Sequence, residues 1–232
     1  MAGAAIRTSG LTKDYGGGRG LFDLDLQVSA GESFGLLGDE GAGKTTVTRL
    51  LMGMIRPSRG SAYVFGLDCF REAVEVKRRV GYMPDALPDF GAMRCGEVAS
   101  YVAGLRGGVH RDRVRELAER IDVDLGRRHD ESGPGERQKV SIILAFMHEP
   151  DLLILDEPSQ DLDDHGAAEL SSMIEESREA GATILLASRN AAEVARLCDV
   201  AAVLRRGKLS RPARVEDLRA ELEEKSRKAL PP

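Results

Sequence analysis

The run of residues 38–46, Gly-Asp-Glu-Gly-Ala-Gly-Lys-Thr-Thr, constrains the fold of this chain more than any other feature. It fits the pattern G-x-x-x-x-G-K-[ST], in which glycines let backbone N–H groups point toward phosphate oxygens. Apolar residues at 33–37 predict a short buried strand before the run, and an amphipathic pattern at 47–55 predicts a helix after it. This order places bound phosphate at the positive end of a helix dipole. The sequence therefore predicts a phosphate-binding loop, or P-loop, for a nucleoside triphosphate.

The residues of this P-loop are the first candidate contacts to a nucleotide. They are Gly38, Asp39, Glu40, Gly41, Ala42, Gly43, Lys44, Thr45 and Thr46. Lys44 can reach the β- and γ-phosphates, and the hydroxyl of Thr45 can bind Mg²⁺. Asp39 and Glu40 are unusual here, but their side chains can point away because only backbone groups are needed at these positions. If Glu40 points inward, it repels the triphosphate unless a cation offsets its charge.

Length, charge and hydropathy limit the class of protein. The 232 residues suffice for one sizeable core, and the formal net charge of −5 argues against broad nucleic-acid binding, which needs a basic surface. No apolar run approaches the roughly 20 residues of a membrane-spanning helix, and residues 1–8 lack the apolar core of a signal peptide. The isolated cysteines favour reduced cytosolic thiols over disulfides or a metal site; they are Cys69, Cys95 and Cys198. The histidines lack the spacing of metal ligands and are interpreted as surface or satisfied structural residues; they are His110, His129, His148 and His165.

The order of apolar patterns predicts an α/β fold. Alternating residues at 21–28 predict one half-buried strand near the N-terminus. Helical periodicity dominates residues 98–121, where Gly107 and Gly108 divide the pattern into two helices. Strand patterns return at 152–155, 183–187 and 200–204. We therefore expect a nucleotide-binding α/β unit that is interrupted by a helical block.

This organisation gives definite domain boundaries. We predict a P-loop NTPase core made of residues 1–85 and 149–210, with antiparallel strands at its N-terminal end. An α-helical subdomain is inserted at 86–148. Residues 211–232 form a charged C-terminal tail, and the helical pattern at 215–228 is typical of a solvated surface helix or a regulatory tail.

A second motif, Leu-Leu-Ile-Leu-Asp-Glu at 152–157, follows the P-loop by roughly 110 residues, the separation expected of a Walker B element. Four apolar residues before two acids indicate a buried strand that ends at a polar crevice. In parallel α/β sheets, ligands bind at the carboxyl ends of the strands. Asp156 can therefore hold Mg²⁺, directly or through water, and Glu157 can orient or deprotonate an attacking water.

Further segments follow in a consistent order, and they carry a family resemblance. They are Leu-Thr-Lys-Asp-Tyr-Gly at 11–16, Arg-Val-Gly-Tyr-Met-Pro at 79–84, Ser-Gly-Pro-Gly-Glu-Arg-Gln-Lys-Val at 132–140, Pro-Ser-Gln-Asp-Leu-Asp at 158–163 and Ala-Ser-Arg-Asn at 187–190. With the P-loop and Walker B, they make the chain resemble the nucleotide-binding subunit of an ATP-binding-cassette (ABC) transporter from about residue 6 to 209. The residues at 137–140 and 145–150 are similar to those of drug and antibiotic exporters.

The resemblance implies an ATPase that uses ATP and Mg²⁺ and works as a pair of cassettes. Each ATP would lie between the P-loop of one subunit and the signature segment of the other, which is residues 132–140 here. Gly133 and Gly135 would then face the partner's nucleotide, and Tyr15 would stack on adenine. The second ATP-binding subunit can form a homodimer or a heterodimer. ATP binding would close the pair, and hydrolysis at Glu157 would reopen it.

The same resemblance implies an integral membrane permease as a partner. The helical subdomain and the loop at 85–93 would press on a cytoplasmic helix of that permease, so that ATP binding drives transport. The chain itself would not touch the transported compound. It would be cytoplasmic and peripheral on the inner face of the cell membrane, with no nucleic acid as a partner.

Several positions depart from the family pattern. Gly133 lacks the signature hydroxyl, and Pro134 lacks a backbone N–H, so two phosphate contacts are lost unless a one-residue shift brings Ser132 into use. Asp85 stands at the glutamine of the Q-loop, the loop that follows residues 79–84, where a carboxylate can still bind Mg²⁺. Arg189 replaces the histidine of the H-loop at 187–190. It stays charged and cannot shuttle a proton, but it can contact a γ-phosphate.

These departures predict ATP-Mg binding with slow hydrolysis by the isolated chain, and they leave alternatives open. The candidate catalytic residues are Glu157, Arg189 and Asp85, and the candidate metal ligands are Thr45, Asp85 and Asp156. A nucleotide-binding regulatory subunit without turnover is one alternative. A non-transport ABC ATPase acting on ribosomes or DNA is another, although such proteins usually carry two cassettes or long coiled-coil arms. A GTPase is disfavoured because the chain lacks an N-K-x-D guanine motif.

Overall fold

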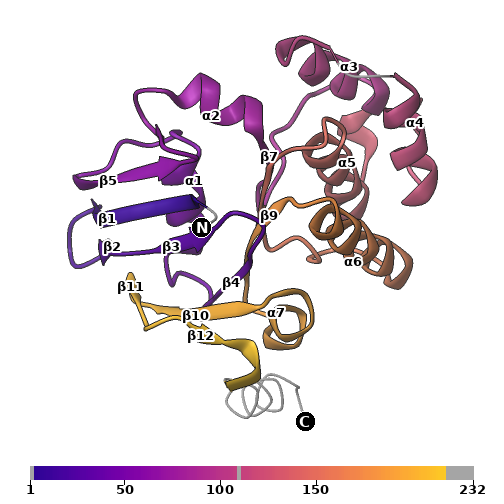
Figure 1. The fold of residues 1–232 in the computed structure, drawn as a ribbon. Helices are drawn as coiled ribbons and strands as arrows, with labels where there is room; N and C mark the ends of the chain where they lie inside the picture. Colours follow the sequence, from indigo (N-terminus) through magenta and orange to yellow (C-terminus); the bar gives the residue numbers. More distant parts are fainter. Residues whose placement is uncertain (1–2, 109–110, 218–232) are drawn as a thin grey trace.

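A computed structural model describes residues 3–108 and 111–217, which form two β-sheets and a helical lobe (Figure 1). The central sheet has the strand order β11-β10-β4-β9-β8-β7, and β12 also pairs with β10. Its strands are β4 (Ser33–Leu37), β7 (Val80–Met83), β8 (Leu152–Asp156), β9 (Thr183–Ser188), β10 (Val200–Arg205), β11 (Lys208–Leu209) and β12 (Ala213–Arg214). The pairings among β7, β8, β9, β4 and β10 are all parallel, and β11 and β12 join antiparallel.

Both faces of the parallel sheet are covered, which explains its continuous apolar strands. Every residue of β8 is buried. Its alternate side chains enter different cores, because Leu152 and Ile154 pack with α1 (Lys44–Leu51) and the N-terminal sheet, whereas Leu153 and Leu155 pack with the helical lobe. A strand buried on both sides reads as an unbroken apolar run rather than an alternating one. The expectation of an α/β P-loop NTPase fold is confirmed.

The second sheet is antiparallel and contains the N-terminal strands, as the sequence predicted. It consists of β1 (Ala4–Asp14), β2 (Gly20–Leu24), β3 (Gln27–Ser29), β5 (Arg59–Val64) and β6 (Leu67–Asp68). The single strand expected at 21–28 is wrong, because the chain forms β2 and β3 with a break between them. The hydroxyl of Thr8 causes this break, since it donates to Leu24 O and accepts from Leu26 N, both at 2.8 Å.

The helices cover the parallel sheet from two sides. On the side of the antiparallel sheet lies α1, whose buried Val47, Leu50 and Leu51 contact strands of both sheets. The helix predicted at 47–55 begins three residues earlier and ends earlier, so those bounds were wrong. Two more helices that border the core are α2 (Ala73–Arg79) and α7 (Ala191–Leu197), and α6 (Asp164–Glu179) lies on the face opposite α1 (Figure 1).

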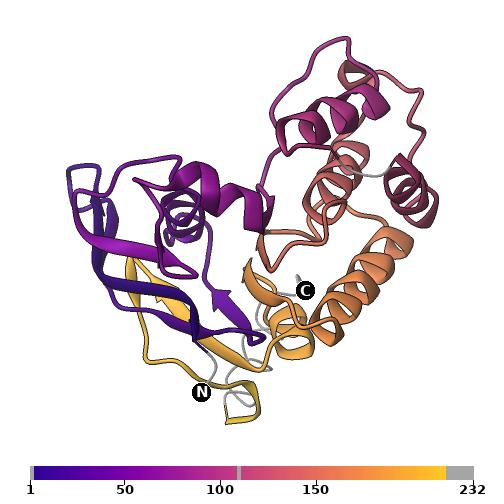
Figure 2. The same cartoon turned by 45° about the horizontal axis from the view of Figure 1, so that its top comes forward.

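A helical lobe stands at the end of the molecule away from β1 and β2 (Figure 2). It contains α3 (Cys95–Leu105), α4 (Arg111–Arg120), the short 3₁₀ helix η1 (His129–Glu131) and α5 (Pro134–Phe146). The division of residues 98–121 into two helices is confirmed, although the first begins at Cys95. These elements fall inside the segment 86–148 that the sequence assigns to the inserted subdomain, and the boundaries themselves stay a prediction.

The C-terminal part of the described chain belongs to the sheet edge. Within the tail expected at 211–232, β12 pairs with β10 and Val215 is buried. Most of the helical pattern at 215–228 lies outside the described residues. No helix in the described ranges is long and apolar enough to cross a membrane.

Candidate functional site

The P-loop joins the end of β4 to the start of α1. Gly41 and Gly43 adopt positive φ angles of 73° and 111°, a backbone conformation that side chains disfavour. A Cβ on Gly38 would lie 2.7 Å from the carbonyl oxygen of Leu204, so this position also needs glycine. The resulting tight loop ends at the N-terminus of α1, where unpaired N–H groups and the helix dipole favour bound phosphate.

Lys44 is held inside this loop by three oxygen atoms. Its side chain is only 6% exposed, and its Nζ lies 2.9 Å from Glu157 Oε1. The same Nζ donates to the carbonyl oxygens of Gly38 at 2.6 Å and Asp39 at 3.1 Å. The ammonium group of the P-loop therefore contacts the carboxylate at the end of the Walker B strand directly.

Asp156 is fully buried at the carboxyl end of β8. Its Oδ2 accepts a hydrogen bond from Thr48 Oγ1 at 3.1 Å, whereas Oδ1 has no partner among the described residues. Burial raises the pKa of Asp156 to about 6; the neighbouring hydroxyl of Thr45 opposes this shift, and the nearby negative charge of Asp85 adds to it. A buried carboxylate oxygen without a partner, beside a threonine hydroxyl and a second carboxylate, suits a hard divalent cation.

Glu157 follows in a left-handed backbone conformation, with φ at 49°. Its backbone N donates to Ala187 O at 2.8 Å, which fixes the residue against the end of β9. Its Oε2 accepts from the backbone N of Arg189 at 3.1 Å, while Oε1 pairs with Lys44. The carboxylate is thus aimed at the P-loop from the opposite wall of the site.

These groups surround one cavity of about 460 Å³. Its lining consists of Glu40, Gly41, Ala42, Gly43, Lys44, Thr45, Thr46, Asp85, Ala86, Glu157, Gln160 and Arg189. The structure therefore brings together most of the residues that the sequence selected from three distant segments. Gly38, Asp39 and Asp156 do not line the opening but adjoin it through Lys44 and Thr45.

Two residues at the cavity mouth replace the expected family side chains. Asp85 lies on its rim, with Oδ1 3.9 Å from Arg49 Nη2 and the side chain 40% exposed. Arg189 is also exposed, and its Nη2 contacts Gln160 Oε1 at 3.5 Å. Because both side chains line the cavity that holds Lys44 and Glu157, both lie within the candidate site.

Sequence reasoning missed two residues of this site. Thr48 binds the Walker B carboxylate, and its position four residues after Lys44 on α1 could have indicated that both face the same side of the helix. Gln160 also lines the cavity. It lies in the loop after the Walker B motif, where no helical or strand periodicity could predict the direction of its side chain.

Tyr15 does not line this cavity. It is 50% exposed in the turn between β1 and β2, and Lys13 Nζ lies 5.5 Å from the centre of its ring. The turn leads to Gly20, whose carbonyl oxygen is 3.6 Å from the place of a Cβ on Gly43. The stacking of Tyr15 on adenine stays a prediction.

The signature segment begins α5 and lies away from the cavity of its own chain. Gly133 is the exposed N-cap of the helix, and its N–H donates to Glu136 Oε2 at 3.0 Å. A Cβ on Gly135 would collide with the carbonyl oxygen of Asp161, so glycine allows α5 to contact the loop after Walker B. The buried Ser132 donates its hydroxyl to Arg128 O at 3.0 Å, which disfavours the one-residue shift that would expose it.

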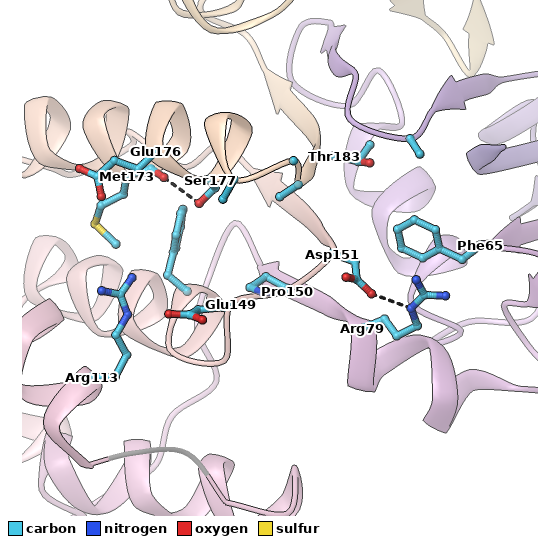
Figure 3. Close-up of a pocket in the computed structure, with 15 residues that line it drawn as sticks. Phe65, Arg79, Arg113, Glu149, Pro150, Asp151, Met173, Glu176, Ser177 and Thr183 are labelled. Atoms are coloured by element: carbon cyan, nitrogen blue, oxygen red, sulfur yellow. Dashed lines mark hydrogen bonds and ion pairs between the residues drawn. The ribbon is translucent and has the colours of Figure 1, made fainter. Parts of the chain in front are cut away.

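A different cavity lies at the opposite, amino-terminal ends of β8 and β9 (Figure 3). Arg79 pairs there with Asp151 at 2.7 Å and stacks on Phe65. Arg113 and Glu149 lie on separate elements of its wall. Arg79 is already paired with Asp151, and Arg113 lies on a different element, so we do not assign the nucleotide to this cavity.

Comparison with known proteins places this geometry in context. A family model described as "ABC transporter" matches residues 21–160. Over 211 residues the chain is 32% identical to the bacitracin transport ATP-binding protein BcrA of Bacillus licheniformis, covering 88% of this chain and 68% of that protein. Over 227 residues it is 35% identical to the daunorubicin resistance ATP-binding protein DrrA3 of Streptomyces coeruleorubidus, covering 95% and 72%.

A solved structure shows the same fold. The chain superposes on one described as the ATP-binding subunit of an ABC transporter, with a TM-score of 0.82 and 26% identity, covering 94% of this chain and 93% of the other. A dimeric ATP-binding cassette bound to ADP and phosphate has a TM-score of 0.80 at 17% identity, covering 90% and 98%, and supports the fold alone.

Proposed function

This chain belongs to the ABC transporter family, and from that membership we propose that it is the ATPase subunit of an exporter, with weak hydrolysis when it is isolated. Within the family it is an ATP-binding subunit. The observation that supports a working nucleotide site is the convergence of Lys44, Glu157 and Asp85 on one cavity. The similarity to proteins named for bacitracin transport and daunorubicin resistance supports the exporter assignment.

The donor set fits Mg²⁺ with a triphosphate. Thr45, Asp156 and Asp85 would hold the ion, and the unpartnered Oδ1 of Asp156 supports this assignment. When bound, the ion would neutralise charge on the β- and γ-phosphates. The backbone N–H groups of the P-loop and the ammonium group of Lys44 would bind the phosphates themselves.

Glu157 would orient the attacking water and accept its proton. Its carboxylate faces the P-loop and is fixed by Lys44 and by the backbone N of Arg189. Because Arg189 stays protonated, it would not take part in proton transfer, but its fixed charge would stabilise negative charge on the γ-phosphoryl group. Hydrolysis therefore depends on Glu157, and Arg189 would act electrostatically.

Weak hydrolysis follows from the signature segment. Pro134 occupies the first turn of α5 without a backbone N–H, and Gly133 offers no hydroxyl. A partner's γ-phosphate would therefore find fewer donors at this helix start than in a complete signature. A homodimer would contain two such weakened contacts, whereas a heterodimer could contain only one, and both assemblies remain part of the proposal.

An apolar groove between the core and the helical lobe supports a permease as partner. We call it the interlobe groove; it has a volume of about 520 Å³ and is lined by Arg49, Met52, Met54, Val74, Lys77, Arg78, Tyr82, Pro84, Ala86, Leu87, Pro88, Phe90, Val102, Leu105, Arg106 and Leu144. Three of these side chains are exposed although apolar, namely Met54 at 50%, Val74 at 64% and Leu105 at 71%. A cytoplasmic helix of a membrane subunit would cover them. The chain would then lie peripherally on the inner face of the membrane.

A regulatory subunit without turnover is the second candidate, and the replacement at Arg189 together with Pro134 favours it. The decisive experiment compares the purified chain with its Glu157→Gln variant for ATP-Mg binding and for phosphate release. If both bind ATP and only the parent releases phosphate, Glu157 is catalytic. Equal absence of phosphate release from both proteins, with and without a co-expressed permease, would instead support the regulatory role.

A further inference from the structure

Two segments of the helical lobe are joined by a ladder of backbone hydrogen bonds. We call it the lobe ribbon; it pairs residues 91–96 with residues 125–130, and Arg94 forms an antiparallel bridge with Arg128. Its hydrogen bonds run from Gly96 N to Leu125 O (2.9 Å), Cys95 N to Arg127 O (2.9 Å), His129 N to Met93 O (2.8 Å) and Asp130 N to Gly91 O (3.0 Å). The first segment follows the loop that carries Asp85, and the second leads into α5.

His129 lies in the second segment of this ribbon, next to its last pair, Gly91 and Asp130. The imidazole is 0% exposed, and its Nδ1 accepts the backbone N–H of Phe90 at 3.3 Å. The two rings are also in edge contact, with centroids 5.4 Å apart and planes at 87°. Asp89 Oδ1 lies 3.6 Å from the same Nδ1. A side-chain contact thus ties the loop before α3 to the segment before α5.

The imidazole is not simply a satisfied core residue. Its Nε2 is buried and has no partner among the described residues. An unpaired buried polar atom costs free energy, whereas an apolar side chain would fill the same space without that cost. What histidine supplies here, and an apolar residue does not, is the acceptor for the N–H of Phe90.

The contact between Phe90 and His129 connects two parts of the molecule that the proposed function uses: the loop beside the nucleotide cavity and the interlobe groove, and the start of α5. On one side, Phe90 lines the interlobe groove, and the loop to which it belongs begins at Asp85 in the nucleotide cavity. On the other side, η1 starts at His129, and the N-cap of α5 is Gly133. Arg137 Nε donates to Ser132 O at 3.1 Å, which fixes the residues between η1 and α5 against the first turns of α5.

We propose that His129 is a positioning residue that transmits displacement of the 85–93 loop to the first turn of α5. The loop moves when the groove or the nucleotide cavity is occupied, an assignment that rests on the proposed function. The signature segment then moves with the loop, because the hydrogen bond from Phe90 N to His129 Nδ1 and the lobe ribbon hold the two segments together. The 85–93 loop and the start of α5 therefore respond as one body.

The matched variants are His129→Asn and His129→Gln. The amide of asparagine is attached to Cγ, as Nδ1 is, so its oxygen can replace the acceptor for Phe90. The amide of glutamine is one bond further out, at the place of Nε2, so it keeps polarity and size but loses that acceptor. If His129 has a merely structural role, the two variants should behave alike. If the proposed link exists, His129→Asn should keep it and His129→Gln should lose it. Thermal unfolding checks that both variants fold.

The first experiment measures hydrogen–deuterium exchange of the full chain without nucleotide. Phe90→Ala perturbs the loop from the groove side, and the readout is the exchange of amides at 133–138. In the parent and in His129→Asn, we expect Phe90→Ala to raise that exchange about fivefold, because the change removes the packing of the ring on the lobe while it keeps the backbone N–H of residue 90 as a donor. In His129→Gln the same change should raise it by less than about twofold, because the link is already cut. His165→Gln, at an exposed histidine of α6, is the control and should leave the response at its parental size.

The second experiment adds ATP-Mg and measures nucleotide binding in the same samples. We expect slower exchange at both 85–93 and 133–138 in the parent and in His129→Asn, and only at 85–93 in His129→Gln. Equal responses of the asparagine and glutamine variants in either experiment would overturn the proposal. Unchanged exchange at 133–138 when Phe90→Ala is introduced into the parent would also overturn it. Failure to bind ATP-Mg would instead overturn the proposed function, and the first experiment would still decide the role of His129.

Discussion

Replacing Glu157 by glutamine should tighten ATP binding while it stops turnover. The reason is the contact of 2.9 Å between Lys44 Nζ and Glu157 Oε1. A phosphate that takes Lys44 as its partner has to displace this carboxylate and has to approach its negative charge. Glutamine keeps the size of the side chain and removes the charge. It also removes the group that would accept a proton from the attacking water.

The size of the effect follows from the charge that is lost. The side chains of Lys44 and Glu157 are 6% and 14% exposed, so solvent screens them only in part. Two unit charges about 6 Å apart interact by roughly 3 kcal/mol at an effective dielectric constant near 20. Mg²⁺ offsets part of this repulsion, and so do the backbone carbonyls of Gly38 and Asp39, which still accept hydrogen bonds from Lys44 in the variant. We therefore expect a net gain of about 1.4 kcal/mol, which is tenfold tighter binding.

Isothermal titration calorimetry can measure this difference. ATP is titrated first in EDTA, where hydrolysis is suppressed, and then with Mg²⁺. The control is Glu119→Gln, which removes an exposed carboxylate on α4 with no ion-pair partner among the described residues. If Glu157→Gln binds ATP no more tightly than the parent, the competition between Glu157 and phosphate is refuted. If Glu119→Gln tightens binding equally, the gain reflects net charge rather than the site.

Three other outcomes test separate parts of the structure. Gly135→Ala should lower the free energy of unfolding by about 1–3 kcal/mol, because its Cβ would collide with the carbonyl oxygen of Asp161; unchanged urea unfolding would contradict that contact. Asp156→Ala should abolish the gain in ATP affinity that Mg²⁺ confers on the parent, so a persistent gain in titrations with and without the ion would place the metal elsewhere. Burial lowers the pKa of His148 from 6.5 to about 4, so the unfolded chain binds more protons between these values. The free energy of unfolding should therefore fall by about 1–2 kcal/mol as the pH drops from 6.5 to 4, after allowance for screening, and His148→Gln should lose this part of the slope in urea unfolding.

The sequence predicted the site well because its parts are set by short-range rules. A P-loop needs glycines at fixed spacing, and a Walker B strand needs apolar residues before its acids. Both motifs end parallel strands, so their side chains had to meet at one sheet edge. Lys44 and Glu157, separated by more than a hundred residues, are in contact for this reason.

The errors arose where distant residues decide local structure. The break between β2 and β3 depends on the hydroxyl of Thr8, which lies in another strand, so the alternating pattern at 21–28 could not reveal it. The start of α1 was placed too late because Lys44, Thr45 and Thr46 show no apolar periodicity, although they form its first turn. The interpretation of His129 as a surface or satisfied structural residue is right about its burial and about Nδ1, but wrong about Nε2, which has no partner among the described residues.

The helix α5 carries two of the altered positions at its start and supports the Walker B end further along. Its first turn carries Gly133 and Pro134, whereas its next turn is fastened to the Walker B end. Gln138 Nε2 donates to the carbonyl oxygens of Glu157 at 3.2 Å and Pro158 at 3.1 Å. The replacements at Gly133 and Pro134 therefore change the surface offered to a partner without removing the support of Glu157. In the proposed pair, the ATP on this P-loop depends on the partner's signature, so slow turnover of the isolated chain would measure its own altered signature rather than a defect at Glu157.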